Sequence, residues 1–468
     1  MGSRAISQET VTLSISENLG DARTATIQFV DKDNETLALI KIEQAERIII
    51  DIPSDIKIAF PDKNFRGYVL GYFDRDKNGV ISEEEALEIT EINVNQKEIK
   101  SLEGIQYFKN LKYLQCKDNQ LTTLDVSKNT VLTFLTCHSN QLISLDVSKN
   151  TALTSLNCSG NELTSLDVSK NTALTSLNCE NNQLTTLDVS GCTALTGLSC
   201  YNNRLTALDV SGCTALTGLS CNNNQLTALN VSKNTALTGL WCHSNQLTSL
   251  DVSGCTKLNY LHCYNNQLTS LDVSGFTSLN YLHCYNNQLT SLDVSGCTAL
   301  TELLCYNNQL TSLDVSGCTA LTKLSCHDNQ LTTLDVSGYK ALKTLDCENN
   351  QLTTLDISGC TALTKLYCKD NQLTSLDVSR CKALDRLDCE NNQLNSLNVS
   401  GCTELIGLKC YNNQLTSLYV SGCTELSWLY CNMPSLEFLF VKKGQRIEGI
   451  TENRSESYIN LETTIRYI

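Results

Sequence analysis

The feature that most constrains this chain is a 21-residue repeat that continues through most of its 468 residues. The segment 258–278, LNYLHCYNNQLTSLDVSGFTS, is followed by residues 279–299, which repeat it almost letter for letter. Asparagine recurs every 21 residues from Asn119 to Asn413 in fifteen copies, and cysteine does so from Cys116 to Cys431 in sixteen copies. A strict period of this length predicts a solenoid, in which each unit buries its apolar side against its neighbours.

Each unit follows the pattern L-x-x-L-x-C-x-x-N-Q-L-x-x-L-D-V-S-x-[NC]-T-x, with position 1 first at Leu111. The runs around positions 4 to 6 and 14 to 16 alternate apolar and polar residues, which is typical of strands. We therefore expect two short strands in each coil, stacked into two parallel sheets. Six inward apolar groups leave no room for a long helix. The asparagine at position 9 turns the chain, and its amide predicts a ladder of hydrogen bonds to unpaired backbone groups.

A family resemblance follows from these residues. The segment L-x-x-L-x-C-x-x-N-Q-L, as in residues 258–268, resembles the signature of the leucine-rich repeat. The 21-residue unit with L-D-V-S in its second half looks like the short class common in bacterial surface proteins. The resemblance covers residues 111 to 441. It implies a curved solenoid with the cysteine strand on the concave face and a location at the cell surface or outside the cell, but it names no ligand.

Composition agrees with a repeat protein. The three prolines, Pro53, Pro61 and Pro434, all lie outside the regular repeats, and the net charge of −15 argues against nucleic acid as a partner. No apolar run approaches the length of a membrane span. The sequence shows no signal peptide, so we expect the export signal to lie outside it.

The cysteines are all in register with the repeat. Of the 25 cysteines, sixteen occupy position 6 and nine occupy position 19, where earlier copies carry Asn129, Asn150 and Asn171. A buried free cysteine behaves as a small apolar residue, so we predict free thiols that fill the core. Neighbouring thiols would lie within disulfide distance, but parallel side chains in register give a poor dihedral angle. The sequence has no C-x-x-C pair, which disfavours zinc.

The residues before the repeats suggest two further modules. Residues 10–15, 24–29 and 36–42 alternate like strands, and the run 22–44, ARTATIQFVDKDNETLALIKIEQ, resembles the final strands of the BACON domain, a β-sandwich module of Bacteroidetes proteins. The match covers about half of such a domain. It implies carbohydrate or mucin binding, of which half a domain would keep little.

A calcium-binding pattern follows. Phe65, Tyr68, Val69 and Tyr72 have helical spacing, and residues 74–85 then fit the EF-hand loop D-x-[DN]-x-[DN]-G-x₅-E. Calcium needs six or seven oxygen ligands, and the spacing supplies them from one loop. The stretch 60–111 resembles the N-terminal cap of such repeats in anaerobic gut bacteria, which implies one structural calcium ion; the alternative is a metal-free relic turn. The predicted ligands are Asp74, Asp76, Asn78, the Val80 carbonyl, Ser82 through water, and Glu85.

The expected organisation has four parts. Residues 1–50 form a partial BACON-like β module, 51–110 a helical N-terminal cap with the EF-hand-like loop, 111–431 the repeats, and 432–468 a β C-terminal cap. The expected fold is a leucine-rich-repeat solenoid, mainly β with two stacked parallel sheets and little helix.

The outward positions 3, 5 and 7 of the first strand carry the candidate binding surface. All five histidines and both tryptophans occupy these positions. Amphipathic rings of this kind form hot spots in protein interfaces and platforms for sugars. The alternatives are inheritance by recent duplication and sheet stabilisation by cross-strand pairs. If His262 and His283 contact a ligand, affinity should change between about pH 5 and 8. The predicted ligand-binding residues are Trp241, His243, Tyr260, His262, Tyr264, Tyr281, His283, Tyr285 and Tyr306.

A second outward row lies at position 15, which is aspartate in twelve copies from Asp125 to Asp377. Adjacent carboxylates about 5 Å apart repel by roughly 1 kcal/mol even in water. We expect hydrogen bonds from neighbouring Ser or Thr to offset this repulsion.

Three classes of function remain. The favoured interpretation is a non-enzymatic, monomeric recognition protein that binds a protein or a glycan on the concave face. The alternative is a passive spacer, which suits the small residues Ser155, Ser176 and Gly197 of the early repeats. An enzyme is disfavoured, because the sequence shows no nucleophile elbow, metal triad or phosphate loop, and a flat sheet supplies no pocket.

Overall fold

A computed structural model of the chain describes residues 24–30, 36–43, 58–451 and 454–468. The chain divides into the units Met1–Ile58 and Ala59–Ile468. In the first unit, β1 (Thr24–Val30) and β2 (Thr36–Glu43) form an antiparallel pair. This pair confirms two of the predicted strands, and the one predicted at residues 10–15 lies outside the described residues.

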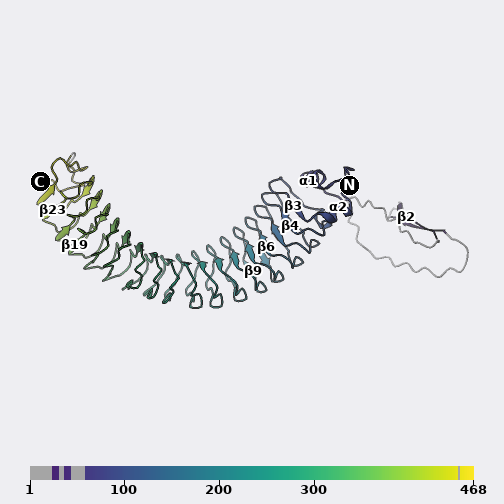
Figure 1. The fold of residues 1–468 in the computed structure, drawn as a ribbon, viewed down its shortest axis with the longest axis horizontal. Helices are drawn as coiled ribbons and strands as arrows, with labels where there is room; N and C mark the ends of the chain where they lie inside the picture. The colour runs from purple at the N-terminus through teal and green to yellow at the C-terminus, as the bar shows by residue number, and fades with distance from the viewer. Residues whose placement is uncertain (1–23, 31–35, 44–57, 452–453) are drawn as a thin grey trace. The chain divides into compact units, whose positions relative to one another are not determined.

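The second unit is built on one long parallel sheet, the main sheet, to which each coil contributes a short strand. Figure 1 shows the coils as a single curved row, with α1 (Lys63–Phe73) and α2 (Glu83–Glu88) near its first strands. From the strand of Leu114 onward, each strand pairs in register with the strand 21 residues further on, as Leu261 does with Leu282, while the first strand pairs Ile92 with Leu114. The strands, in order, are β3 (Glu91–Asn93), β4 (Tyr113–Gln115), β5 (Phe134–Thr136), β6 (Ser155–Asn157), β8 (Ser176–Asn178), β10 (Gly197–Ser199), β11 (Gly218–Ser220), β12 (Gly239–Trp241), β13 (Tyr260–His262), β14 (Tyr281–His283), β15 (Glu302–Leu304), β16 (Lys323–Ser325), β17 (Thr344–Asp346), β18 (Lys365–Tyr367), β20 (Arg386–Asp388), β22 (Gly407–Lys409) and β24 (Trp428–Tyr430).

The expected second sheet is present only in pieces, so the prediction of two strands in every coil is wrong. Elsewhere in the described repeats, the second row consists mostly of single-residue bridges such as Asp125 to Asp146. The position 15 side chain accepts from the backbone N–H two residues on in both arrangements, as Asp251 does beside a bridge and Asp188 does within a strand. The strand pieces add ladder bonds such as the one from Val168 N–H to the Asp188 carbonyl at 3.0 Å. The pieces are β7 (Ser165–Asp167) with β9 (Thr186–Asp188), β19 (Ser375–Asp377) with β21 (Ser396–Asn398), and β23 (Ser417–Tyr419) with β25 (Phe438–Val441) and β26 (Thr464–Tyr467).

The core is a stack of identical layers. In the coil that begins at Leu258, the side chains at positions 1, 4, 6, 11, 14 and 16 are all buried. The same positions are buried in neighbouring coils, so each layer covers the apolar side of the next. The expected mainly β solenoid with little helix is confirmed, because the described repeats contain strands, bridges and turns and their inward positions are filled by Leu, Val and Cys.

The turn after each main-sheet strand is fixed by positions 8 and 9. Position 8 adopts a left-handed backbone, with φ of 53° at Asn265 and 58° at Gly160, which suits Asn, Asp and Gly. The next asparagine forms the predicted ladder. Asn245 Nδ2 donates to the carbonyls of Cys242 and Cys221, each at 3.1 Å, and its Oδ1 accepts from Leu226 N at 3.0 Å. Each such side chain therefore joins two coils.

Position 19 has a structural role that the sequence pattern did not reveal. Asn171 Nδ2 donates to the Val147 carbonyl at 3.0 Å, and Cys192 Sγ donates to the equivalent Val168 carbonyl at 3.3 Å. The hydroxyl of Tyr339 makes the same bond to Val315. Asn, Cys and Tyr at this position can each donate to one buried carbonyl of the preceding coil, whereas Phe276 fills the same place without a donor.

The N-terminal cap is fastened to the first coil by one aspartate and a cluster of rings. Asp62 caps α1 by accepting from Asn64 and Phe65 N–H at 2.9 and 3.0 Å, and its other oxygen accepts from Lys100 N–H at 2.8 Å. The ring of Phe60 lies 5.4 Å from that of Phe65 and 6.0 Å from that of Phe108. The short 3₁₀ turn Ile105–Tyr107 completes the first coil.

The other end of the stack is covered by residues after β24. The Cys431 N–H donates to the Tyr458 carbonyl at 2.7 Å, and Thr463 Oγ1 donates to the Leu436 carbonyl at 2.8 Å. Ile447 and Ile459 are fully buried beneath these segments. The last apolar layer is therefore shielded from water, as the end of a solenoid requires.

Candidate functional site

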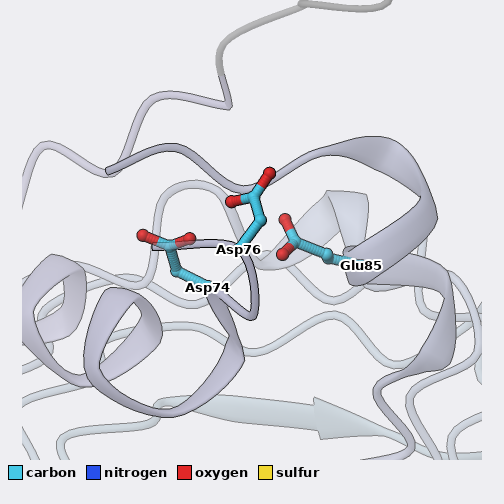
Figure 2. Close-up of side chains that lie close together, drawn as sticks. All are labelled: Asp74, Asp76 and Glu85. Carbon is cyan, nitrogen blue, oxygen red and sulfur yellow. The ribbon is translucent and has the colours of Figure 1, made fainter. Parts of the chain in front are cut away.

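The acidic loop between α1 and α2 gathers three of the predicted calcium ligands. Oxygens of Asp74, Asp76 and Glu85 all lie within 4.8 Å of one another. Figure 2 shows the three carboxylates, two from the loop and one from the start of the helix. A calcium ion binds oxygens at about 2.4 Å, so one ion could bridge such a set. Among the described residues, no other group of three acidic, His or Cys side chains meets this criterion.

The remaining predicted ligands hold the loop in shape. Asn78 Oδ1 accepts from the Val80 N–H at 2.8 Å, and the Asn78 N–H donates to both Asp74 and Asp76, at 3.1 and 3.0 Å. Ser82 caps α2 and shares a capping box with Glu85. The left-handed backbone at Gly79, with φ of 81°, makes the sharp turn possible.

Glu85 is prepared to carry a negative charge. Burial acts to raise its pKa, but hydrogen bonds from the Ser82 and Arg75 N–H groups, at 2.9 and 2.8 Å, outweigh this and place the pKa below the usual value. A buried anion beside two further carboxylates is a donor set that suits a hard divalent cation. Asp74, Asp76 and Glu85 would hold the ion, and the ion would neutralise their mutual repulsion and fasten the two helices of the cap.

The predicted binding residues lie together on the outer face of the main sheet, and we call them the aromatic face. Position 7 forms a continuous pile of near-parallel rings from His243 through Tyr264, Tyr285 and Tyr306 to His327. Successive ring centroids are 4.1, 4.3, 4.3 and 4.3 Å apart. His327 was not among the predicted ligand residues, although it has the same position in the repeat. The continuous ring surface expected from the sequence is therefore present and one coil longer.

Two shorter rows lie beside this pile. At position 5, His262 stacks on His283 at 4.2 Å, and Trp241 meets the edge of His262 at 6.3 Å. At position 3, Tyr260 stacks on Tyr281 at 4.9 Å. The indole of Trp241 lies across Gly239, where an added Cβ would come within 2.4 Å of the ring, so that glycine makes room for the tryptophan.

Stacking determines what these rings can offer a ligand. A ring with neighbours about 4.3 Å away on both sides has both π faces covered, so its edge and its hydroxyl or nitrogen remain for contact. The inner rings are half-buried, whereas Tyr260 is 41% exposed. Sugar platforms use open ring faces, while protein interfaces also use ring edges and hydroxyls. This geometry favours a protein ligand over a glycan.

Burial favours the neutral form of His243, His262 and His283. Burial lowers the pKa of His243 and His262 to about 4. Burial also lowers the pKa of His283, against the opposing charge of Glu302, whose Oε1 is 3.2 Å from His283 Nε2. For His262, the expected change in affinity between about pH 5 and 8 therefore does not follow in the free protein. Its proton uptake falls at lower pH because ring stacking removes it from water.

The cysteines lie in the core. All 25 are free and buried. Burial raises the pKa of Cys116 and Cys158 to about 12, so these thiols stay protonated and unreactive at neutral pH. The interpretation as core-filling thiols is confirmed in this respect.

The position 15 aspartates are stabilised as expected. In Asp146 and Asp188 the backbone N–H of the serine two residues on donates to the carboxylate, at 2.8 and 2.9 Å, and lowers its pKa. This row is thus a structural feature of the turn.

Comparison with known proteins agrees with this architecture. A family model described as "Leucine Rich repeats (2 copies)" matches residues 235–276, 277–317 and 319–359. Internalin J of Listeria monocytogenes serotype 4b (strain F2365) is 41% identical over 71 residues, which are 15% of this chain and 8% of that protein. The chain thus spans a small part of the length of this relative.

Solved structures extend the match over most of the chain. The functional domain of InlJ from Listeria monocytogenes, described as including a cysteine ladder, is 38% identical and has a TM-score of 0.66, covering 77% of this chain and 81% of that domain. A leucine-rich-repeat protein of Leptospira interrogans is 27% identical with a TM-score of 0.60, covering 71% of this chain and 92% of that one. The fold and its ladders define a bacterial leucine-rich-repeat protein. The chain belongs to the leucine-rich-repeat family, in the group related to the Listeria internalins.

No helix in the described part of the chain combines the length and the apolar character that a membrane span needs.

Proposed function

We propose that this chain is a non-enzymatic recognition protein that works at the cell surface or after secretion and binds a protein ligand on the aromatic face. The observation that carries the proposal is the pile of five rings from His243 to His327, whose edges lie on the outer face of the main sheet. This is the face that the family resemblance identifies as concave. A regular sheet of this kind offers a wide, pre-formed surface rather than a pocket.

The rings are suited to binding because they can change without disturbing the core. They project from positions 5 and 7, while the inward positions 4 and 6 of the same strands are buried. The stack also fixes the side chains before a ligand arrives, which lowers the entropy lost on binding. The plant receptor RGFR1, solved in complex with RGF2, shares the fold at 19% identity.

The test uses two sets of variants. The soluble protein is first screened against arrays of host proteins and glycans. Trp241→Ala with Tyr264→Ala and Tyr285→Ala should then weaken the binding of a hit by at least about 2 kcal/mol, roughly thirtyfold. Tyr264→Phe with Tyr285→Phe keeps the stack and removes the hydroxyls that we expect to contact the ligand, so it should weaken binding without lowering the melting temperature.

Ser155→Ala with Ser176→Ala, on the same face of the early repeats, serves as the control and should bind as the wild type does. Unchanged affinity in the triple aromatic variant would refute the proposal and leave sheet packing as the role of the rings. Hits confined to glycans would refute the choice of a protein ligand. If the whole protein acts as a passive spacer, no array hit should depend on these residues.

The N-terminal modules complete the proposal. The loop of Asp74, Asp76 and Glu85 holds one structural calcium ion, in the manner of an EF-hand. Residues 1–50 belong to a partial BACON-like module of the Bacteroidetes type, of which the described antiparallel pair would form two strands. The recognition unit acts as a monomer.

A further inference from the structure

The coils beyond the aromatic face carry a cluster of carboxylates on the same side of the main sheet. Asp346 and Glu348 come from one coil, and Asp388 and Glu390 come from the coil two places further on. We call these four residues the acidic face. Between them, in register with both aspartates, lies Tyr367 on β18. With strands about 4.8 Å apart, the two aspartates flank the tyrosine at a separation of about 10 Å.

These carboxylates are unusually buried for outward positions. Asp388 is 7% exposed and Glu390 is 6% exposed. The Glu390 Oε2 atom is buried and accepts no hydrogen bond from the described part of the chain. The hydroxyl of Tyr411 is hydrogen-bonded to the Glu390 carboxylate, and this bond raises the pKa of Tyr411 to about 12. A buried carboxylate oxygen without a donor is costly, so a cation or a donor from outside would stabilise it.

Four basic side chains, Lys365, Lys369, Arg386 and Lys409, share the outward positions of these coils with the four carboxylates, and two of them form ion pairs with the acidic face. Lys409 Nζ lies 3.3 Å from Asp388 Oδ2, and Lys369 Nζ lies 3.7 Å from Glu348 Oε2. Asp346 accepts from Ser325 Oγ at 3.4 Å, and its nearest cationic candidate is His327 Nε2 at 3.9 Å.

The crowding is visible in the titration behaviour. Burial, followed by the charge of Asp346, raises the pKa of Glu348 to about 7. Burial also raises the pKa of Asp346. The ionised form of these carboxylates is therefore destabilised, and a bound cation would stabilise it.

The spacing of the carboxylates selects the kind of cation. In the described residues, the acidic loop at Asp74 supplies the one set of three oxygens close enough for a metal ion, and the acidic face is not such a set. A ligand here has to reach several separated carboxylates. The aromatic side chain of Tyr367 between two aspartates suits a planar guanidinium, which can stack on a ring and donate to carboxylates at its edges. A lysine ammonium gains less from the ring and cannot donate in a fork.

We propose that the acidic face binds an arginine-rich segment of a protein partner, with one guanidinium over Tyr367 between Asp346 and Asp388 and with Glu390 taking a further donor. This inference rests on the proposed function, because it names the chemistry of a partner that docks on the outer face of the main sheet. The acidic face lies in the coils that follow His327, so a partner could engage it and the aromatic face together.

The test measures binding of a fluorescent oligo-arginine peptide by anisotropy at about 0.15 M ionic strength, where long-range attraction is screened. Asp388→Asn with Glu390→Gln keeps the shape of both side chains and should weaken binding about tenfold. The matched control, Asp293→Asn with Asp314→Asn, removes two carboxylates from the position 15 row and should change affinity less than about twofold. Melting temperatures show whether each variant is folded, and Asp346→Asn provides an independent variant of the face.

Three comparisons decide the outcome. The arginine peptide should bind more tightly than an oligo-lysine peptide of equal length, and Tyr367→Leu should reduce that preference. Equal losses in the two double variants would show general charge attraction and overturn the proposal. Equal affinity for the two peptides would also overturn it. So would displacement of the peptide by millimolar calcium, measured on the Glu85→Gln variant. The triple aromatic variant should bind the peptide like the wild type, so failure here is distinguishable from failure of the aromatic face.

Discussion

One asparagine in each coil explains how such short strands hold together. Its side-chain amide donates to carbonyls of two coils and accepts from the backbone of the preceding one, as Asn245 does. The sequence predicted this ladder because an amide at a fixed turn position has both donors and an acceptor. The sequence did not predict the hydrogen bond at position 19, where Asn, Cys and Tyr replace one another. These side chains share an acceptor, and that acceptor is a carbonyl of the preceding coil, which only the structure places beside them.

Position 19 also shows why cysteine can replace asparagine. The amides of Asn129, Asn150, Asn171 and Asn234 donate well, but each leaves its Oδ1 buried without a partner. A thiol donates more weakly to the same carbonyl and carries no strong acceptor to leave unpaired. Asparagine thus donates more strongly but leaves a buried acceptor unpaired, whereas cysteine donates more weakly and leaves none.

A prediction at the residue scale concerns calcium and Glu85. Added calcium should raise the melting temperature of the N-terminal cap in calorimetry, because an ion at a hundred times its Kd adds about 2.7 kcal/mol to stability. Glu85→Gln should abolish this rise; glutamine can still serve in the capping box with Ser82, but it loses the acceptor for the Arg75 N–H, so the metal-free variant is the baseline for its own calcium response.

Glu83→Gln is the matched control, because Glu83 is an exposed acid of the same helical turn that pairs with Lys109 at 3.1 Å. It should keep the calcium response. A wild-type cap that melts at the same temperature in calcium and in chelator would exclude the calcium site.

A second prediction at this scale concerns the histidine rings. His243 and His262 have a pKa of about 4 in the folded protein, below the ordinary value of 6.5. Between these values the unfolded chain binds more protons than the folded protein. The free energy of unfolding should therefore rise with pH from about 4 to 6.5, and the contribution of these histidines should be complete above that range. The groups that face them are His283, Glu302 and each other.

His262→Asn should flatten this rise by roughly 1 kcal/mol, a magnitude reduced for partial solvent exposure. Urea unfolding of both proteins at several pH values gives the difference, and other titrating groups cancel in it. NMR titration gives the direct check, since a pKa of His262 above about 6 would contradict the burial argument.

At the scale of elements, the first strand of each coil followed from the alternation of apolar and polar residues, but the second did not. Both runs alternate equally well in sequence. The aspartate at position 15 bonds to the turn that follows in both cases, at Asp251 beside a single bridge and at Asp188 within β9, so this bond does not decide the outcome. Alternation reports which side a residue faces, but it does not report how many ladder hydrogen bonds form between neighbouring coils.

The aromatic face illustrates the same limit. Its members were predictable, since positions 3, 5 and 7 of the repeat point outward. The near-parallel stacking of Tyr264 on Tyr285 at 4.3 Å was not, because it depends on the rotamers that neighbouring coils impose on each other. The burial of Glu390 among outward residues was hidden for the same reason.

The cysteine columns give a prediction at the scale of elements. All 25 thiols should resist alkylation in the native protein and react fully after unfolding, as measured by mass spectrometry without reduction. The reason is that alkylation requires an accessible thiolate, and these groups are buried with a pKa raised to about 12 at Cys116 and about 11 at Cys213. Disulfides between neighbouring coils in freshly purified protein would contradict this expectation.

At the scale of the whole molecule, the repeat makes each coil replaceable by the next. Residues 258–278 and 279–299 have nearly the same sequence, and their strands β13 and β14 pair in register. The backbone pairing and the asparagine ladder that join one coil to its neighbour are repeated 21 residues later, as at Asn266 and Asn287. Stability is then close to a sum over coils and the contacts between adjacent coils.

Deletion of residues 258–278 should therefore give a folded protein, because residue 279 then follows residue 257 in the same register. The position 7 pile would lose Tyr264 and close again, with Tyr285 stacked on His243. Deletion of residues 258–277, one residue fewer, leaves the register shifted by one, which turns inward side chains outward in the adjoining coil. Circular dichroism, thermal unfolding and limited proteolysis should show a cooperative fold for the first deletion and local cleavage near the junction for the second. If both deletions unfold alike, then contacts beyond neighbouring coils hold the stack together.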